Sequence, residues 1–268
     1  MVAMLFAAGL GTRLKPFTDA HPKALFPIGG KTLLQWQIEM LRDVGIRDII
    51  INVHHFAEQI IQYVEEHAQF GCNIRISDER AALLDTGGGL RKALALLPTF
   101  GKEASKEPLL LCNVDILSNI ALPRFLQAAS AETAAGALAT LVVSERETQR
   151  YLLFDSQQQL KGWTNIATHA LRPERLQQHP EEAAQYQRLA FSGMQVISPH
   201  IAPYLEEVAQ EKGDVFSLID LYLHICQHHP EVHIEAYVPT DYHMMDVGKT
   251  AQRHEAEQFA KDYLTAHA

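Results

Sequence analysis

The sequence predicts an α/β fold in which helices cover both faces of a mixed, mostly parallel sheet. Hydrophobic residues make up 47% of the 268 residues and charged residues 21%, which is typical of a globular chain with a substantial core. Short apolar segments alternate with segments whose apolar residues recur at helical spacing. This alternation indicates a Rossmann-like sheet, and ligands of such sheets bind beyond the carboxyl ends of the strands.

Five apolar segments have the length and composition of buried strands. They are Ala3–Ala7, Asp48–Val53, Asn73–Ser77, Leu109–Asn113 and Ala137–Val143. Helical spacing is found between the first three of them, in Leu33–Val44 and Ala57–His67.

The pattern changes after about residue 144. The segments YLLFD and LKGW predict a hairpin, while FSGMQVISP and HIEAYV predict further strands. A helix is expected from Thr250 onward. The polar segment Thr164–Gln187 has weak apolar periodicity, so we expect a partly helical surface excursion. Whether this segment forms a lid over the site is left open.

Composition excludes several classes of protein. The formal net charge is -9 and no dense basic run offsets it, which argues against nucleic-acid binding. Cys72, Cys112 and Cys226 have no C-x-x-C spacing, so we expect reduced thiols and no zinc site. No leader peptide and no membrane-spanning run is recognisable, and we therefore expect a cytoplasmic protein without a membrane partner.

The first apolar segment is followed by GLGTRLKP, which combines glycines with basic residues. A dinucleotide-binding loop needs G-x-G-x-x-G, yet Leu14 occupies the third glycine position. A Walker loop needs G-x-x-x-x-G-K-[ST], which is also missing. The backbone at Gly9 and Gly11 can still curl around phosphates, and Arg13 and Lys23 add positive charge. The alternative is a tight turn with solvated basic side chains.

AAGLGTRLKPFTDAHPKALFPIGGKTLLQ resembles the signature of the sugar-1-phosphate nucleotidyltransferases. Further segments resemble those of the family in the expected order: LLDTGGGLRKAL, CNVDIL, FSGMQVISP and MMDVGKTAQ. The resemblance implies the nucleotidyltransferase fold as a single domain over 1–268. It further implies a nucleotide-binding half over about 1–145, a sugar-binding half over about 146–248, and a C-terminal helix over 249–268.

The resemblance also implies roles for individual residues. Arg13 and Lys23 are expected to be catalytic, on the β,γ-phosphates and the α-phosphate respectively, and Asp115 and Asp246 to bind Mg²⁺. The residues expected to contact the nucleotide are Ala8, Gly9, Gly11, Thr12, Asp85, Thr86, Gly87 and Gly88. The residues expected to contact the sugar are Asn165, Ser192 and Gly193.

Other interpretations of these residues stay open. Asp115 could cap a helix, and Asp241 competes with Asp246 for the metal. Trp163 could form part of the sugar site or of the core. The three glycines from Gly87 onward precede an expected helix LRKALALL, where they predict either close backbone contact with base and ribose or a flexible turn.

The sequence departs from the family pattern at several positions. Thr32 replaces a proline, and Asp85 replaces a glutamate of the most similar subgroup. Many members carry E-K-P after the central strand, whose lysine meets the sugar phosphate. Here the region reads SERETQRYLLFD, where Arg146 or Arg150 could take that role.

The implied reaction joins an NTP and a sugar 1-phosphate to give an NDP-sugar and pyrophosphate. The DTGGGL and FSGMQVI segments resemble the N-acetylmuramate 1-phosphate uridylyltransferases of cell-wall recycling, which favours UTP. Mannose-1-phosphate guanylyltransferase and phosphocholine cytidylyltransferase are the alternatives. A regulatory subunit that only binds nucleotide-sugars is disfavoured, since the glycine loop, Arg13, Lys23 and both aspartates are retained. We expect a monomer or homodimer.

Overall fold

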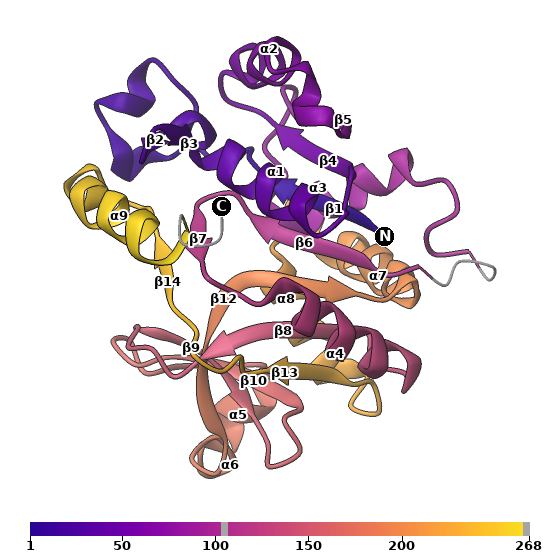
Figure 1. The fold of residues 1–268 in the computed structure, drawn as a ribbon. Coiled ribbons are helices and arrows are strands. Elements are labelled where there is room, and N and C mark those ends of the chain that lie inside the picture. The colour runs from indigo at the N-terminus through magenta and orange to yellow at the C-terminus, as the bar shows by residue number, and fades with distance from the viewer. Residues whose placement is uncertain (103–106, 265–268) are drawn as a thin grey trace.

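The computed structural model describes residues 1–102 and 107–264. Within these residues, ten strands form one mixed sheet through the middle of the molecule (Figure 1). The strands are β1 (Val2–Phe6), β4 (Asp48–Val53), β5 (Asn73–Asp78), β6 (Leu109–Asn113), β8 (Ala139–Ser144), β9 (Arg150–Phe154), β10 (Leu160–Asn165), β11 (Ala170–Arg172), β12 (Gln187–Ile197) and β13 (Ile234–Tyr237).

The first half of the sheet has the order β5–β4–β1–β6, and all neighbours are parallel. Strands β4, β1 and β6 are mostly apolar and buried on both faces, whereas β5 at the sheet edge is more polar and only partly buried. Because the strands are parallel, their carboxyl ends lie at one edge of the sheet. Ala7 follows β1 there, Asn52 lies near the end of β4, and Val114 follows β6. The predicted fold class is confirmed.

Strand β12 joins two parts of the sheet. Met194–Ile197 pair antiparallel with β6, whereas Gln187–Leu189 pair with β9 of the predicted hairpin β9–β10. The register shifts between these parts, and Gly193 has a φ of 71° there. Glycine adopts positive φ without strain, so β12 can bend at Gly193. The bend lets its first part pair with β9 and its last part with β6.

Helices cover both faces of the sheet. They are α1 (Leu33–Asp43), α2 (Ala57–Glu66), α3 (Asp85–Ala93), α4 (Leu122–Ala134), α5 (Glu174–Gln178), α6 (Pro180–Ala183), α7 (Ala202–Lys212), α8 (Leu218–His228) and α9 (Arg253–Phe259). In Figure 1, α1 and α4 lie in front of the sheet and α7 lies behind it.

Apolar spacing decides which face each helix covers. Leu34, Ile38 and Leu41 of α1 recur at helical spacing and join one core cluster, which also contains buried residues of α2 and α4. Buried residues of α3, α7 and α8, among them Leu205 and Leu221, join the core on the other face. Both faces of the sheet are thereby dry, as the alternation of strands and helices predicts.

The segment Thr164–Gln187 is partly helical, as predicted, but it is not only a surface excursion. It adds β11 to the sheet edge and then forms α5 and α6. Leu176 of α5 is fully buried against Leu153 and anchors the segment. The expectation of an exposed excursion is corrected, because Leu176 and Ala183 are buried against Leu153 and attach the segment to β9.

The C-terminal helix begins later than expected. Thr250–Gln252 form a 3₁₀ turn, α9 follows, and Ala260–Leu264 form a π-helical turn. The last four residues of the predicted helix, 265–268, lie outside the described residues. Across the described ranges, no helix combines the length and apolar character needed to cross a bilayer.

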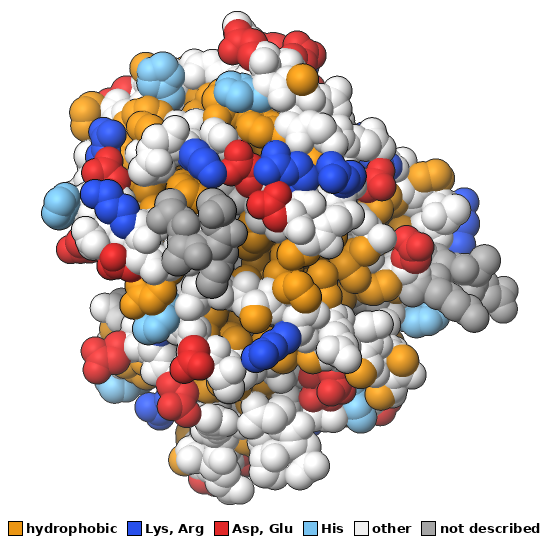
Figure 2. All heavy atoms as spheres, in the orientation of Figure 1, with side chains coloured by type: hydrophobic (Ala, Val, Ile, Leu, Met, Phe, Trp, Pro, Cys, Tyr) orange, Lys and Arg blue, Asp and Glu red, His pale blue; other side chains and the backbone are white. Residues whose placement is uncertain are grey.

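Two short strand pairs complete the architecture. Strands β2 (Pro27–Ile28) and β3 (Lys31–Thr32) form a hairpin before α1, and β7 (Ile116–Ser118) pairs with β14 (Met244–Asp246). Figure 2 shows the face with α1 and α4, where basic and acidic side chains are interspersed around a hydrophobic hollow.

Candidate active site

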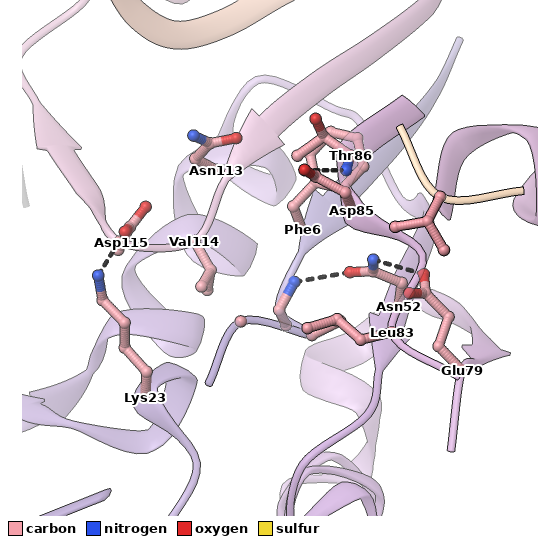
Figure 3. Close-up of a pocket in the computed structure, with 14 residues that line it drawn as sticks. Phe6, Lys23, Asn52, Glu79, Leu83, Asp85, Thr86, Asn113, Val114 and Asp115 are labelled. Atoms are coloured by element: carbon pink, nitrogen blue, oxygen red, sulfur yellow. Dashed lines mark hydrogen bonds and ion pairs between the residues drawn. The ribbon is translucent and has the colours of Figure 1, made fainter. Parts of the chain in front are cut away.

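A cavity of about 350 Å³ opens at the carboxyl ends of the parallel strands. Figure 3 shows that its polar side chains come from both ends, with Lys23 and Asp115 on one side and Asp85 and Glu79 on the other. The lining residues come from the segments after β1, β4, β5 and β6, from the start of α3 and from the loop before α8. They are Phe6, Ala7, Ala8, Gly9, Lys23, Asn52, Glu79, Leu83, Asp85, Thr86, Asn113, Val114, Asp115 and Val215.

Lys23 and Asp115 form an ion pair at one end of this cavity (Figure 3). Lys23 belongs to a short 3₁₀ turn between two prolines and is only 9% exposed. A lysine so deeply placed needs a partner for its charge, and Asp115 supplies it from the end of β6. Asp115 does not cap a helix, since Ala121 precedes the first residue of α4.

Asp246 is brought beside Asp115 by the pairing of β7 with β14. Asp246 is paired with Ile116, and the Val247 amide donates to the Asp115 carbonyl at 2.9 Å. Enclosure by protein and the Asp115 carboxylate raise the pKa of Asp246, although its surface is still open to solvent, and Lys23 and Arg13 oppose the rise. Two adjacent carboxylates are hard oxygen ligands that suit Mg²⁺.

Asp241 lies outside the β7–β14 pairing that brings Asp246 beside Asp115. It belongs to the turn before β14 with a φ of 51°, and its backbone carbonyl accepts a hydrogen bond from the Asn119 side-chain amide at 2.9 Å. This hydrogen bond stabilises the turn.

The glycine loop directs Arg13 toward the two carboxylates. Gly11 has a φ of 61°, and a Cβ there would lie 2.8 Å from Lys23 Cβ. Arg13 reaches across to Gly248, where a Cβ would lie 3.2 Å from Arg13 Nη2 and from Asp246 Oδ1. Within the described part of the chain, Arg13 is in no ion pair and is exposed, so its guanidinium is free to bind an anion.

Asn52 and Glu79 form a buried polar pair under the cavity that the sequence analysis missed. Asn52 accepts from the Ala7 amide and donates to Glu79 Oε1, both at 2.7 Å, and Glu79 also accepts from Leu84 N at 3.2 Å. Burial raises the pKa of Glu79. The pair ties the glycine loop to the entry of α3. Its signal in the sequence is weak: one polar residue near the end of β4 and another directly after β5.

The expectation for the three glycines needs correction, because they lie inside a helix. Helix α3 begins at Asp85, and both the Gly87 and Gly88 amides donate to the Phe216 carbonyl. A Cβ on Gly88 would lie 2.0 Å from the Asp214 carbonyl oxygen. These glycines therefore permit close helix-to-loop packing, whereas Asp85 and Thr86 before them line the cavity.

Gly88→Ala is expected to destabilise the protein by about 2–3 kcal/mol, because the methyl group must displace backbone at Asp214. The melting temperature measures this loss. Gly9→Ala is the matched control, since a Cβ at Gly9 meets nothing within 4 Å, and it should change stability by less than about 0.5 kcal/mol. Equal melting temperatures for the two variants would contradict the packing role of Gly88.

The residues predicted to contact the sugar lie in two separate places. Gly193 is beside the end of β6, where a Cβ would lie 3.0 Å from Asn113 Nδ2, and Ser192 next to it is buried. Asn165 lies at the end of β10, and its side-chain oxygen accepts from Ala167 N at 3.0 Å. Trp163 packs against the core, which favours the structural interpretation. None of the three predicted sugar residues, Asn165, Ser192 and Gly193, lines the cavity.

Of the two candidate arginines, Arg146 is the one near the carboxylates. Its Nη2 donates to the Phe191 carbonyl at 3.1 Å, and its charge, after those of Lys23 and Arg13, opposes the rise in the pKa of Asp246. Arg150 is instead an exposed residue of β9, paired across the strands with Asn165.

Comparison with known proteins agrees with this geometry. The chain is 38% identical over 116 residues to an N-acetylmuramate alpha-1-phosphate uridylyltransferase of Caulobacter vibrioides, covering 42% of this chain and 45% of the relative. It is 37% identical over 130 residues to the protein of that name from Neisseria meningitidis serogroup B, covering 48% and 53%. The alignments thus span about half the length of these relatives.

Solved structures show the same fold. UDP-glucose pyrophosphorylase complexed with UDP-glucose has a TM-score of 0.71 at 18% identity, covering 97% of this chain and 98% of the other. HddC from Yersinia pseudotuberculosis complexed with GMP-PN has a TM-score of 0.66 at 21% identity, covering 96% and 98%. The family model described as nucleotidyl transferase matches residues 2–262, so the chain belongs to the nucleotidyl transferase family.

Proposed function

We propose that this chain is an enzyme that transfers a nucleotidyl group from an NTP to a sugar 1-phosphate and releases pyrophosphate. The observation that carries the proposal is the convergence of Arg13, Lys23, Asp115 and Asp246 beside a cavity large enough for a nucleoside. Such a set of charges suits phosphoryl chemistry, which depends on positioning and charge neutralisation.

In the proposed reaction, a phosphate oxygen of the sugar 1-phosphate attacks the α-phosphorus of the NTP. The bond from that phosphorus to the bridging oxygen breaks, and the electron pair leaves with pyrophosphate. The attacking oxygen is already ionised at neutral pH, so no general base is required. The task of the chain is to hold two anions in line.

Each charged residue has a part in this task. Lys23 lines the cavity and would bind the α-phosphate, the group at which the bond to pyrophosphate breaks. Arg13, which lies beside Gly248 and is in no ion pair with a described residue, would bind the β- and γ-phosphates, and the amides of the glycine loop would add further donors. Asp115 and Asp246 would hold Mg²⁺, which supplies charge neutralisation for the departing pyrophosphate when it is bound.

For the substrates we propose UTP and N-acetylmuramate 1-phosphate, within cytoplasmic cell-wall recycling. The two uridylyltransferase relatives support this choice. We further propose that residues 1–145 bind the nucleotide and that 146–248 bind the sugar. Arg146 would replace the missing lysine at the sugar phosphate, since its charge acts on Asp246, whereas Arg150 is an exposed residue at the start of β9.

The test is pyrophosphate release from each of four NTPs with a panel of sugar 1-phosphates and phosphocholine, with Mg²⁺ and then with a chelator. We expect the highest kcat/KM with UTP and N-acetylmuramate 1-phosphate, and loss of release with the chelator. Release with GTP and mannose 1-phosphate, or with CTP and phosphocholine, would overturn the substrate but keep the reaction. A folded protein that releases none with any pair would overturn the reaction itself.

A further inference from the structure

A second cluster of charged and metal-ligating side chains lies between α7 and α8, away from the nucleotide cavity. His224 has its Nε2 3.1 Å from Glu207 Oε2 and its Nδ1 3.1 Å from Glu211 Oε2. His229 Nε2 lies 2.8 Å from the same Glu207 oxygen. The His224 side chain is only 11% exposed, so the cluster is held within the helix interface and open at the Glu207 side.

The two contacts of His224 cannot both be hydrogen bonds of a neutral ring. A neutral imidazole has one N–H and one nitrogen lone pair, whereas both nitrogens here face carboxylate oxygens. In a neutral ring, one of the two nitrogens therefore faces a carboxylate oxygen with its lone pair, which is repulsive. The repulsion is removed either by a second proton on the ring or by a metal ion bound at Nε2.

We propose that Glu207, His224 and His229 bind a divalent transition-metal ion of the Zn²⁺ class. Their ligand atoms all lie within 4.8 Å of one another. Ligands 2.0–2.1 Å from a tetrahedral ion lie roughly 3.3 Å apart, so the present 2.8 and 3.1 Å contacts need only small side-chain movements. Water completes the four ligands.

Glu211 supplies the second observation in favour of this site. In the tautomer with the proton on Nδ1, His224 donates to Glu211 Oε2 at 3.1 Å, and the Nε2 lone pair is left for the metal. Carboxylate partners of this kind orient metal-binding histidines in many proteins. His228 and Glu211 form an alternative trio with His224, but binding there would consume the nitrogen that Glu211 otherwise orients.

The site differs from the proposed Mg²⁺ site in place and in chemistry. None of its residues lines the nucleotide cavity, and imidazole ligands select transition metals rather than Mg²⁺. The ion would clamp α7 to α8. The loop between these helices carries Val215 to the cavity, and Leu218 N at its end donates to Thr86 Oγ1 at 3.0 Å. A bound ion would thus stabilise one wall of the nucleotide cavity.

The test uses the full chain, freed of metal with a chelator and titrated with Co²⁺, which replaces Zn²⁺ in tetrahedral sites and absorbs visible light there. We expect one ion per chain to bind saturably with a tetrahedral spectrum, which distinguishes it from an octahedral ion at Asp115 and Asp246. The melting temperature should rise by roughly 5–10 °C once free Co²⁺ is about 100-fold above Kd. Neither readout depends on catalysis, so failure of the proposed reaction would leave this result intact.

Variants assign the ligands. His229→Gln and Glu207→Gln should weaken Co²⁺ binding at least about 10-fold and abolish the rise in melting temperature. His254→Gln is the matched control, because His254 is an exposed histidine outside the cluster, and it should behave as wild type. His228→Gln should also retain binding.

Three results would overturn the proposal. One is the absence of saturable binding in the folded wild-type chain, which would leave His224 in a purely structural role. Another is equal affinity in wild type, His229→Gln and Glu207→Gln. The third is loss of binding in His228→Gln but not in His229→Gln, which would show that the ligands are the alternative trio.

Discussion

Asp115→Asn should lower kcat for pyrophosphate release at least about 100-fold, because it removes a carboxylate that we place at the metal. The same change removes the negative partner of buried Lys23. The Lys23 ammonium would then lose the carboxylate that positions it. Both the proposed metal site and the proposed contact of Lys23 with the α-phosphate would be weakened. Pyrophosphate release at saturating substrates, measured over a range of Mg²⁺ concentrations, gives the size of the loss.

Asp241→Asn is the matched control, since Asp241 lies in the turn before β14 and contributes its backbone carbonyl to Asn119. This variant should keep kcat within about twofold of wild type. Melting temperatures of both variants separate loss of chemistry from loss of folding. If Asp115→Asn were folded and as active as the control, Asp115 would have no part in the reaction.

Asn52→Ala is expected to have the largest effect on stability, about 3 kcal/mol. It leaves the Ala7 amide without its acceptor and removes the Asn52 donor to the fully buried Glu79 carboxyl. Thermal unfolding should show a melting temperature lower by roughly 6–12 °C. The KM for the NTP should rise too, because the pair holds the glycine loop against the entry of α3.

The loss in Asn52→Ala should depend on pH. Burial raises the pKa of Glu79, and the hydrogen bond from Asn52 opposes this rise. Without Asn52 the folded-state pKa rises further, so the variant pays the cost of a buried carboxylate only when Glu79 is ionised. The difference in stability from wild type should be smallest in acid and should grow as pH rises through the raised pKa.

Asn73→Ala is the control, because Asn73 makes the same kind of hydrogen bond, to Asp48 Oδ1 at 2.7 Å, but at an exposed position. Water replaces the lost partner there, so the stability should change by less than about 0.5 kcal/mol. Similar losses in Asn52→Ala and Asn73→Ala would contradict the idea that burial makes the Asn52–Glu79 pair costly to break.

The elements that could be predicted are those whose information is local. Strands β4 and β6 begin and end at the predicted residues, because a short, continuous apolar run is stable only as a strand buried on both faces. Helix α1 begins at the predicted residue and ends one residue before its predicted bound, since apolar spacing is a local signal.

The glycines of α3 mark the limit of such local reasoning. By propensity, three consecutive glycines weaken a helix, and the sequence analysis placed them before one. The structure includes them in α3 because the space of a Cβ is taken by Phe216 and the Asp214 carbonyl. Packing against a loop about 125 residues later outweighs propensity, and no local pattern reports such a contact.

The sequence by itself determined the α/β class, the central strands and the residues that resemble the family signature, because each depends on short-range pattern. Only the tertiary structure decided which of these residues meet. Asp246 reaches Asp115 through the β7–β14 pairing, Arg13 lies against Gly248, and the Asn52–Glu79 pair supports the glycine loop. These contacts join distant parts of the chain. The first two follow from the strand pairing and loop course that the packed core imposes, and the third forms because the buried Asn52 and Glu79 need polar partners.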